Sequence, residues 1–335
     1  MGRRWDAVGL GPGAEFDLIR RFLEGHRVAR PDVRVGPGDD CAVVVGDGIA
    51  VSADLSVEGV HFRRDWLRPE EIGQRAAAAA VSDLAAVAAR PIGVLASLAL
   101  PDSDVPDVAV EVMAGVRRVV EEAGAALLGG DVVRSLDSLV LDIVVLGEAP
   151  RPVLRSGARP GDELWVTGRL GGAAAAVESW RHGRTPVPAA REAFARPRPR
   201  VLEARWLAER GVLHAMIDLS DGLAGDAAHL AAASGVRVVL DLARIPLHPA
   251  ALEATASPED ALRLALAGGE DYELCFAAPR GAVDALAAEF EERFGIPLSR
   301  VGEIEEGEGV YQRRDDGSIE SLAVTGYRHF EGGSR

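Results

Sequence analysis

The stretch Ala215-Met216-Ile217-Asp218-Leu219-Ser220-Asp221-Gly222-Leu223-Ala224-Gly225-Asp226 joins an apolar run to a group of acids. The apolar residues predict a short strand over 212–217, and the leucine and alanine spacing after Gly222 predicts a helix. Ser220 or Asp221 fits a helix N-cap, but a cap needs one oxygen, whereas two carboxylates and a hydroxyl gather in this turn. Hard oxygen ligands suit Mg²⁺, so the stretch alone supports a cap and a metal site about equally.

Aspartates follow apolar segments elsewhere in the chain as well. A strand, a loop and a second strand are expected over 33–45, with Asp39 and Asp40 at the end of the loop. The strand expected over 48–52 is followed by Asp54, and the one expected over 125–131 ends at Asp131. An alanine-rich helix is expected over 72–89, with Asp83 in its middle; a bare carboxylate buried there is costly unless it is paired, protonated or bound to metal. Because strand ends converge on one crevice in open α/β folds, we expect these acids to meet. The acids with this pattern are Asp40, Asp54, Asp83, Asp131, Asp218 and Asp221.

This set of acids points to one kind of chemistry. Carboxylates without cysteine or paired histidine ligands favour Mg²⁺, and several Mg²⁺ ions favour a polyphosphate ligand. Gly129 and Gly130, directly before Asp131, let the backbone approach a phosphate closely. The glycine-rich start of a helix expected over 173–180 is a weaker phosphate signal, which an ordinary tight turn explains as well. The residues therefore predict a Mg²⁺-dependent phosphoryl-transfer site that uses a nucleotide.

The length of 335 residues suits two domains of ordinary size. A segment rich in proline and glycine begins at Pro150, and it places the boundary between domains 1–148 and 149–335. The mixture of predicted strands and helices indicates an α/β (α+β mixed) fold. His61 is expected near the end of a strand over 55–62, and the proline-rich segment 184–200 is expected to be an irregular connection.

The composition excludes several classes of protein. A formal net charge of −15 argues against nucleic acid as a partner, because non-specific binding to it needs clustered positive charge. The chain contains no lysine, which excludes a P-loop, a protein-kinase fold and a Schiff-base enzyme. We expect a cytoplasmic protein without a membrane partner, since neither a signal-peptide pattern nor a bilayer-length apolar segment is found. Cys41 and Cys275 lie far apart in apolar surroundings and are expected to be free thiols.

Several motifs occur together, in order, from Gly36 to Phe330. They are Gly38-Asp39-Asp40-Cys41-Ala42, Ser52-Ala53-Asp54, Val57-Glu58-Gly59-Val60-His61-Phe62, Val81-Ser82-Asp83-Leu84-Ala85-Ala86, Gly129-Gly130-Asp131, Asp218-Leu219-Ser220-Asp221-Gly222-Leu223 and Gly268-Gly269-Glu270-Asp271-Tyr272-Glu273-Leu274. This set resembles the thiamine-monophosphate kinase family, for which the last motif is among the most specific signatures. The chain departs from the family's pattern at Ala53, Val81, Val132 and Val133, where polar side chains are common.

The resemblance implies membership of the superfamily of aminoimidazole ribonucleotide synthetase. That superfamily has two α/β domains and a homodimer whose first-domain strands form a barrel across the two-fold axis. Domain 1–148 would bind ATP and Mg²⁺ and dimerise, and domain 149–335 would complete the active site. The implied reaction is direct in-line transfer of the ATP γ-phosphoryl group to thiamine monophosphate, which is the last step of thiamine diphosphate biosynthesis.

The same resemblance implies roles for individual residues, carried over position by position. Asp54, Asp131, Asp218 and Asp221 would be catalytic. The ligands of several Mg²⁺ ions would be Asp40, Ser52, Asp54, Asp83, Asp131, Asp218 and Asp221. ATP would contact Gly130, Asp131, Arg155 and Ser220, whereas His61, Glu270 and Tyr327 would face the thiamine moiety.

Two alternatives remain at this point. The first is another ATP-using enzyme of the same superfamily, such as selenophosphate synthetase or aminoimidazole ribonucleotide synthetase. Selenophosphate synthetase typically needs a reactive cysteine or selenocysteine beside a lysine, and the chain has no lysine. The second is a scaffold that binds metal and nucleotide without catalysis, which would tolerate the loss of ligands, yet every carboxylate position is filled.

Overall fold

The computed structural model describes residues 21, 31–35, 43–314 and 316–322. Asp40, Cys41 and Tyr327 lie outside the described residues. The chain divides into two compact units, which we call unit 1 (residues 1–84 and 89–152) and unit 2 (residues 85–88 and 153–335). The boundary expected after residue 148 and the separate roles of the two domains stay predictions.

Unit 1 is built on a four-stranded sheet in the order β3-β6-β4-β5. Its strands are β3 (Ile49–Val57), β4 (Arg90–Leu100), β5 (Ala126–Arg134) and β6 (Val140–Glu148). β4 and β5 run parallel, and the pairs that include β6 are antiparallel. A separate antiparallel pair consists of β1 (Val33–Val35) and β2 (Val43–Val44).

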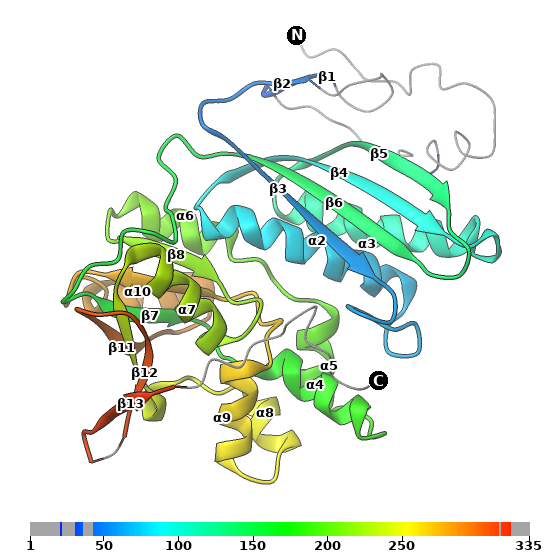
Figure 1. Ribbon diagram of the computed structural model, residues 1–335. Helices are drawn as coiled ribbons and strands as arrows, with labels where there is room; N and C mark the ends of the chain where they lie inside the picture. The colour runs from blue at the N-terminus through cyan, green and yellow to red at the C-terminus, as the bar shows by residue number, and fades with distance from the viewer. Residues whose placement is uncertain (1–20, 22–30, 36–42, 315, 323–335) are drawn as a thin grey trace. The chain divides into compact units, whose positions relative to one another are not determined.

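Two helices cover one face of this sheet, α2 (Pro69–Ala86) and α3 (Asp107–Glu122), as Figure 1 shows. A short 3-10 helix, η1 (Asp102–Asp104), precedes α3. Glycines let the two helices touch backbone to backbone, since a Cβ at Gly73 would lie 1.9 Å from the Val112 carbonyl oxygen. The alanines of α2 from Ala76 to Ala80 are buried, so the predicted buried alanine-rich helix is confirmed.

The opposite face of the unit 1 sheet exposes several apolar side chains. Side chains alternate along β3, and its outward positions include Val51, which is 61% exposed, and Leu55, which is 51% exposed. In the register, Val51 lies opposite Leu146 of β6. Val133 of β5 is 50% exposed. Exposed apolar side chains gathered on one sheet face are typical of an interaction surface.

Unit 2 contains a seven-stranded sheet in the order β13-β12-β9-β11-β7-β10-β8. Only β12 and β9 pair in parallel, and every other neighbouring pair is antiparallel. This sheet is therefore mixed, and the expectation that the acids meet in one crevice stays a prediction. Its strands are β7 (Glu163–Thr167), β8 (Ala215–Asp218), β9 (Arg237–Asp241), β10 (Leu274–Ala278), β11 (Leu298–Glu305), β12 (Gly309–Arg313) and β13 (Ile319–Ser321).

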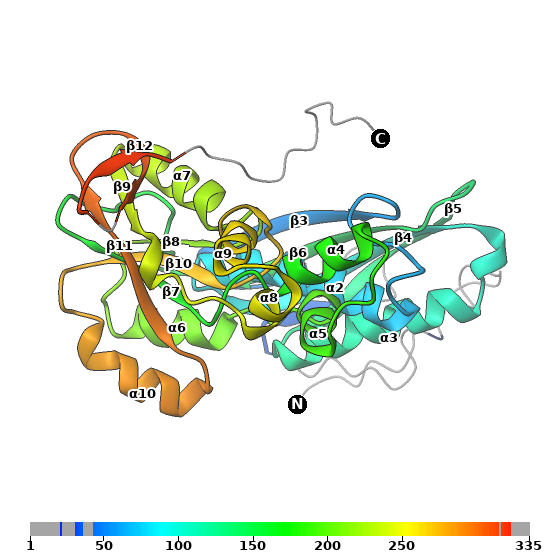
Figure 2. The same ribbon diagram turned by 90° about the horizontal axis from the view of Figure 1, so that it is seen from below.

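Helices lie on both sides of this sheet. Figure 2 shows α7 on one side and α6 and α10 on the other, while α4, α5, α8 and α9 gather in a separate group. Edge-on contacts of Trp206 with Phe290 and Phe294 join α6 to α10, with ring centroids 5.7 and 6.0 Å apart. The helices are α4 (Gly172–Arg181), α5 (Pro188–Ala195), α6 (Val201–Glu209), α7 (Leu223–Ser234), α8 (Pro249–Ala254), α9 (Pro258–Ala267), α10 (Asp284–Phe294) and the 3-10 helix η2 (Leu242–Arg244).

The structure corrects two of the expected elements. The segment 184–200 contains helix α5, because Pro188 stands in the first turn, where its missing N–H breaks no helical bond. Phe194 of this helix is 2% exposed and packs edge-on against Trp180, with ring centroids 5.4 Å apart. The strands expected over 48–52 and 55–62 are one strand, β3, which ends at Val57.

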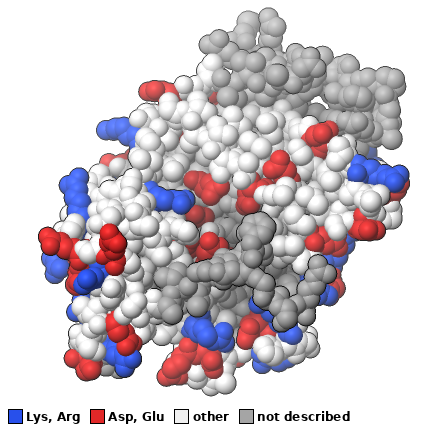
Figure 3. Space-filling model, in the orientation of Figure 1, with Lys and Arg blue, Asp and Glu red and all other residues white. Residues whose placement is uncertain are grey.

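Charged side chains of both signs are interspersed on the face shown in Figure 3. Exposed ion pairs of the described residues include Arg314 with Glu320 at 2.6 Å and Arg63 with Asp65 at 2.8 Å. Within the described part of the chain, no helix is both long enough and apolar enough to cross a membrane.

Candidate functional site

The loop between β8 and α7, which we call the acid loop (residues 218–222), begins at the buried Asp218. α7 starts at Leu223, and its N-cap is Gly222, which has a φ of 103° and makes no side-chain capping bond. A Cβ at Gly222 would lie 2.7 Å from the Leu266 carbonyl oxygen. Gly222 rather than Ser220 or Asp221 is therefore the N-cap, so the capping alternative is not realised. The close approach and the positive φ require glycine at this position.

Asp226 is a further functional candidate, which lies outside the motifs named above. It lies in the first turn of α7, is 2% exposed, and its Oδ2 accepts a hydrogen bond from the Asp221 backbone N–H at 3.1 Å. Burial, together with the negative charges of Asp218 and Asp221, raises the pKa of Asp226 to about 8. Its place as the last acid of the stretch 215–226 was the signal that could have identified it.

The charges around Asp226 provide a test of fit for Mg²⁺. Repulsion from Asp218 and Asp221 contributes to the raised pKa of Asp226, and a bound cation would stabilise the ionised form of such carboxylates. Carboxylate oxygens are also the ligands that Mg²⁺ prefers. The donor types in the acid loop therefore fit the ion. Within residues 31–35, 43–314 and 316–322, however, no three histidine, cysteine, aspartate or glutamate side chains are grouped so that they could hold a metal.

The motif at 268–274, which we call the signature loop, is hydrogen-bonded directly to the acid loop. The Glu270 N–H donates to the Ser220 carbonyl at 2.8 Å, and the Tyr272 N–H donates to the Leu219 carbonyl at 2.9 Å. The Leu219 N–H donates to the Glu273 carbonyl at 2.8 Å. The two motifs therefore form one continuous framework, although they are far apart in the sequence.

Two side chains of the signature loop contact each other. Glu270 and Tyr272 both have positive φ values, 67° and 51°, which residues other than glycine seldom adopt. The Tyr272 hydroxyl donates to Oε2 of Glu270 at 2.7 Å. Tyr272 is 8% exposed, whereas Glu270 is partly exposed. The buried Tyr272 thus holds the partly exposed Glu270 carboxylate through a hydrogen bond.

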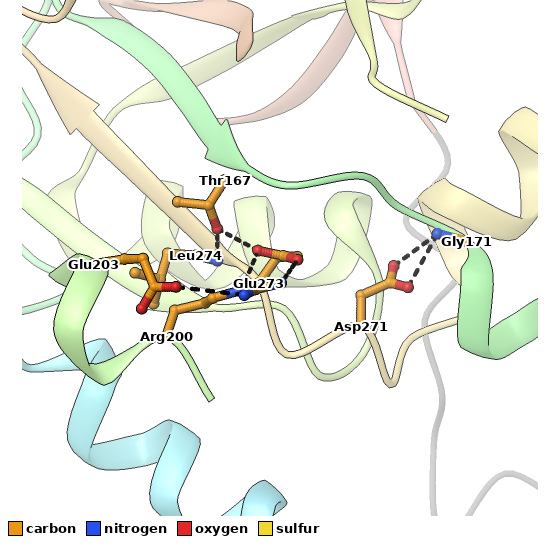
Figure 4. Close-up of polar contacts among 7 residues, drawn as sticks. All are labelled: Thr167, Gly171, Arg200, Glu203, Asp271, Glu273 and Leu274. Carbon is orange, nitrogen blue, oxygen red and sulfur yellow. Dashed lines mark hydrogen bonds and ion pairs between the residues drawn. The ribbon is translucent and has the colours of Figure 1, made fainter. Parts of the chain in front are cut away.

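Asp271 faces the start of helix α4, as Figure 4 shows. Both of its carboxylate oxygens accept from the Gly171 N–H, at 3.0 and 2.9 Å. Burial raises the pKa of Asp271 to about 8, against the opposing effect of these backbone hydrogen bonds. A carboxylate of the protein itself therefore occupies the helix start, which favours the tight-turn interpretation over the phosphate interpretation of this glycine-rich segment.

Glu273 belongs to a buried polar network, also drawn in Figure 4. The Thr167 hydroxyl donates to Oε2 of Glu273 at 2.6 Å and accepts from the Leu274 N–H at 2.9 Å. Arg200 forms an ion pair with Glu273, including a hydrogen bond from Nε to Oε2 at 2.8 Å, and it also pairs with Glu203. No motif in the sequence marks Thr167 or Arg200, because only the fold brings them beside the signature loop.

In unit 1, the structure brings Ser52 and Asp83 together. The Ser52 hydroxyl of β3 donates to Oδ2 of Asp83 in α2. Asp83 is partly exposed rather than buried, and its carboxylate has a hydrogen-bond partner. Asp54 lies two residues after Ser52 and on the same, helix-covered face of β3. Asp54 stands inside the strand rather than at its end, which corrects the sequence-based expectation.

Asp131 also stands inside a strand, β5, rather than at its end. The register aligns Asp54 with Gly130 in one row across the sheet, through Ile143 and Ala96. Because side chains alternate, Asp131 lies on the opposite face of the sheet from Asp54. A Cβ at Gly130 would lie 1.8 Å from the Ala96 carbonyl oxygen, so only glycine fits there.

His61 lies in a turn after β3 rather than in a strand. Its Nδ1 accepts from the Val57 N–H at 3.0 Å, which places the proton of a neutral ring on Nε2. Glu58, at the start of the turn, accepts from the Leu139 N–H at 2.9 Å and pairs with Arg64 at 2.8 Å. These contacts hold the turn in place.

Arg155 is exposed, in the segment that precedes β7. Its carbonyl accepts from the Ser234 hydroxyl at 3.2 Å, and the same hydroxyl accepts from the Gly157 N–H at 3.1 Å. Ser234 is the last residue of α7, so the Arg155 segment is anchored to the helix that follows the acid loop. The thiol predicted at Cys275 is free and buried.

Comparison with known proteins places the chain in a family. Its sequence matches the AIR synthase related protein family in two parts, the N-terminal domain over residues 38–149 and the C-terminal domain over residues 159–313. It is 37% identical over 330 residues to the thiamine-monophosphate kinase of Escherichia coli K12, covering 94% of this chain and 98% of that protein.

Two solved structures are similar over nearly the whole chain. The thiamine-monophosphate kinase of Stenotrophomonas maltophilia K279a is 34% identical with a TM-score of 0.79, covering 95% of this chain and 99% of that one. AaThiL, solved in complex with AMPPCP and TMP, is 30% identical with a TM-score of 0.73, covering 94% of this chain and 95% of that one. The predicted mixed α/β fold of two AIR synthase related domains is thereby confirmed, and the chain belongs to the thiamine-monophosphate kinase family.

Proposed function

We propose that this kinase transfers the γ-phosphoryl group of ATP to thiamine monophosphate and forms thiamine diphosphate and ADP. The observation that carries the proposal is the hydrogen-bonded framework of the acid loop and the signature loop, found in a chain 37% identical to a thiamine-monophosphate kinase. A similar protein solved with AMPPCP and TMP supports ATP and thiamine monophosphate as the substrates. The reaction would be the last step of thiamine diphosphate biosynthesis.

The residues proposed to act in the reaction come from both units. The proposed ligands of Mg²⁺ are Asp40, Ser52, Asp54, Asp83, Asp131, Asp218 and Asp221. The proposed contacts to ATP are Gly130, Asp131, Arg155 and Ser220, and those to the thiamine moiety are His61, Glu270 and Tyr327. Residues 1–148 would supply most of the metal and ATP contacts, and residues 149–335 would complete the site.

The acceptor of the phosphoryl group, thiamine monophosphate, requires metal-binding acids rather than a general base. The phosphate of thiamine monophosphate is already an anion, so no side chain has to remove a proton from it. The barrier is repulsion between two phosphates, and Mg²⁺ bound by the carboxylates would supply the compensating charge. Arg155 would add a fixed positive charge, since the chain has no lysine for this purpose. The protein's own contribution is therefore positioning for in-line attack.

We propose that the protein acts as a homodimer joined through the outer face of the unit 1 sheet. Val51, Leu55 and Val133 expose apolar side chains there, and burial of such a face against a second copy would be favourable. β3 is one of the two edge strands of the sheet, so pairing two such sheets into a barrel would also protect an open edge.

A product assay tests the proposed reaction. The purified chain is incubated with ATP, Mg²⁺ and thiamine monophosphate, with and without a chelator, and thiamine diphosphate and ADP are separated by chromatography. The proposal expects equal amounts of both products and loss of both with the chelator. ADP without thiamine diphosphate would point to another acceptor in the superfamily, and the absence of both products would favour a non-catalytic scaffold.

A further inference from the structure

We infer that Tyr272 is a substrate-positioning residue, which holds the Glu270 carboxylate in the orientation that meets the thiamine moiety. The inference rests on the proposed function, in which Glu270 contacts the thiamine moiety. It adds a residue to which the resemblance gives no role, and it explains why a tyrosine stands between the acids of the signature loop.

The contact itself is short and directed. The Tyr272 hydroxyl donates to Oε2 of Glu270 at 2.7 Å, which is the length expected for a hydroxyl bound to a charged carboxylate. Tyr272 is 8% exposed, so its ring is fixed by packing, whereas Glu270 is partly exposed. A rigid donor on one oxygen fixes the rotation of the carboxylate, and a fixed carboxylate loses less conformational entropy when it binds a ligand.

The backbone of the loop brings the two side chains to this contact. Glu270 and Tyr272 have φ values of 67° and 51°, a left-handed conformation that is unfavourable for both residue types. Backbone bonds from these residues to Ser220 and Leu219 hold them in it. Unfavourable backbone geometry that is maintained by its surroundings is commonly found at functional sites.

The neighbouring residues show that the hydroxyl is not needed to anchor the loop. Asp271 is bonded to the Gly171 N–H, and Glu273 is bonded to Thr167 and Arg200 (Figure 4). The loop is therefore attached to the rest of unit 2 on both sides of Tyr272. The hydroxyl makes its bond to Glu270 instead, so removing it should affect the carboxylate and leave the loop in place.

A double-mutant cycle tests the inference. Y272F removes only the hydroxyl, and it should raise the KM for thiamine monophosphate about tenfold, as expected for loss of a hydrogen bond to a charged group, while the KM for ATP changes less than about twofold. E270Q should also raise the KM for thiamine monophosphate. In the E270Q background, Y272F should add less than about a twofold change, because its effect is transmitted through the carboxylate.

A second background and a control keep the test decisive. E270D withdraws the carboxylate from the hydroxyl, so Y272F should add little there as well. Y311F removes the hydroxyl of a tyrosine in β12 and should leave both KM values unchanged. Equal effects of Y272F in all backgrounds, or an equal rise in both KM values, would overturn the inference. A wild-type protein that forms no thiamine diphosphate would instead overturn the proposed function, and the inference with it.

Discussion

The backbone N–H of Glu270 donates to the carbonyl oxygen of Ser220 across 2.8 Å, and this bond joins the signature loop to the acid loop. Ser220 is a proposed ATP contact and Glu270 a proposed thiamine contact. The bond therefore links the residues proposed for the two substrates through rigid backbone rather than through side chains. Changes to this framework should affect catalysis more than changes of equal size elsewhere in unit 2.

The acid loop gives the most direct mutational prediction. D218N and D221N each keep the shape of the side chain but remove a negative charge, so metal and phosphate binding are lost. We expect the rate of thiamine diphosphate formation to fall about 100-fold or more, with an unchanged circular-dichroism spectrum. D284N, at the exposed start of α10, serves as the control and should retain full activity. Normal activity of either acid-loop variant at limiting Mg²⁺ would refute the assignment.

The contact between the signature loop and the acid loop predicts that alanine substitutions at two glycines have different effects on stability. Gly269 and Gly281 have similar positive φ values, 66° and 74°, but a Cβ at Gly269 would lie 2.3 Å from the Ser220 carbonyl oxygen, whereas nothing lies within 4 Å at Gly281. G281A should therefore lower the free energy of unfolding by only about 1–2 kcal/mol. G269A should lower it further and reduce activity, as measured by chemical denaturation and product assay. Equal losses in both variants would show that the close approach has no effect.

Breaking the buried network around Glu273 should mainly affect stability. The Arg200 and Glu273 side chains are 15% and 6% exposed, so R200M leaves a buried carboxylate without its cation. We expect the free energy of unfolding to fall by about 3–5 kcal/mol. R314M removes the exposed pair of Arg314 with Glu320, whose side chains are 60% and 36% exposed, and should lower the free energy of unfolding far less, because solvent screens the pair. Denaturant titration of both variants would compare the two, and similar losses would contradict the buried role.

The raised pKa of Asp226 predicts how stability depends on pH. An aspartate that titrates near pH 4 when unfolded, but at about 8 when folded, holds a proton only in the folded state between these values. Stability of the metal-free protein should therefore fall as the pH rises from about 4 to about 8. D226N keeps an acceptor for the Asp221 N–H and should show a weaker fall. Thermal melts at several pH values in the presence of a chelator measure both slopes, which should differ.

The proposed dimer predicts the effect of a charge on the outer face of the unit 1 sheet. V51D places a carboxylate at a position that is 61% exposed and would be buried in the dimer. We expect the wild type to behave as a dimer and V51D as a monomer in light scattering coupled to size-exclusion chromatography. L252D, on α8, changes an exposed leucine in unit 2 and should remain dimeric. A monomeric wild type would contradict the proposal.

The sequence predicted most of the regular elements but misjudged where acids stand in them. Helix α2 and the strand-helix junction after Asp218 follow apolar periodicity, which reports local packing. Asp54 and Asp131 were expected at strand ends, yet each lies within its strand, because a sheet can hold an acid on one face while apolar residues fill the other. Helix α5 was missed because flanking prolines resemble those of a loop.

The contacts that organise the site depend on the fold and could not be predicted from sequence spacing. Arg200 and Glu273 are bonded across 73 positions, and Asp271 reaches Gly171 across 100 positions. No local pattern specifies such partners, since they are set by the order of strands in the sheet. The motifs located the signature loop and the acid loop, and the structure added the hydrogen bonds that join them.

The most direct test of the central claim is to follow the phosphoryl group itself. ATP labelled in its γ-phosphoryl group is incubated with the protein, Mg²⁺ and thiamine monophosphate, and the products are separated. The account predicts that the label appears in the terminal phosphoryl group of thiamine diphosphate, in an amount equal to the ADP formed. Label found only in inorganic phosphate, or remaining in ATP, would contradict it.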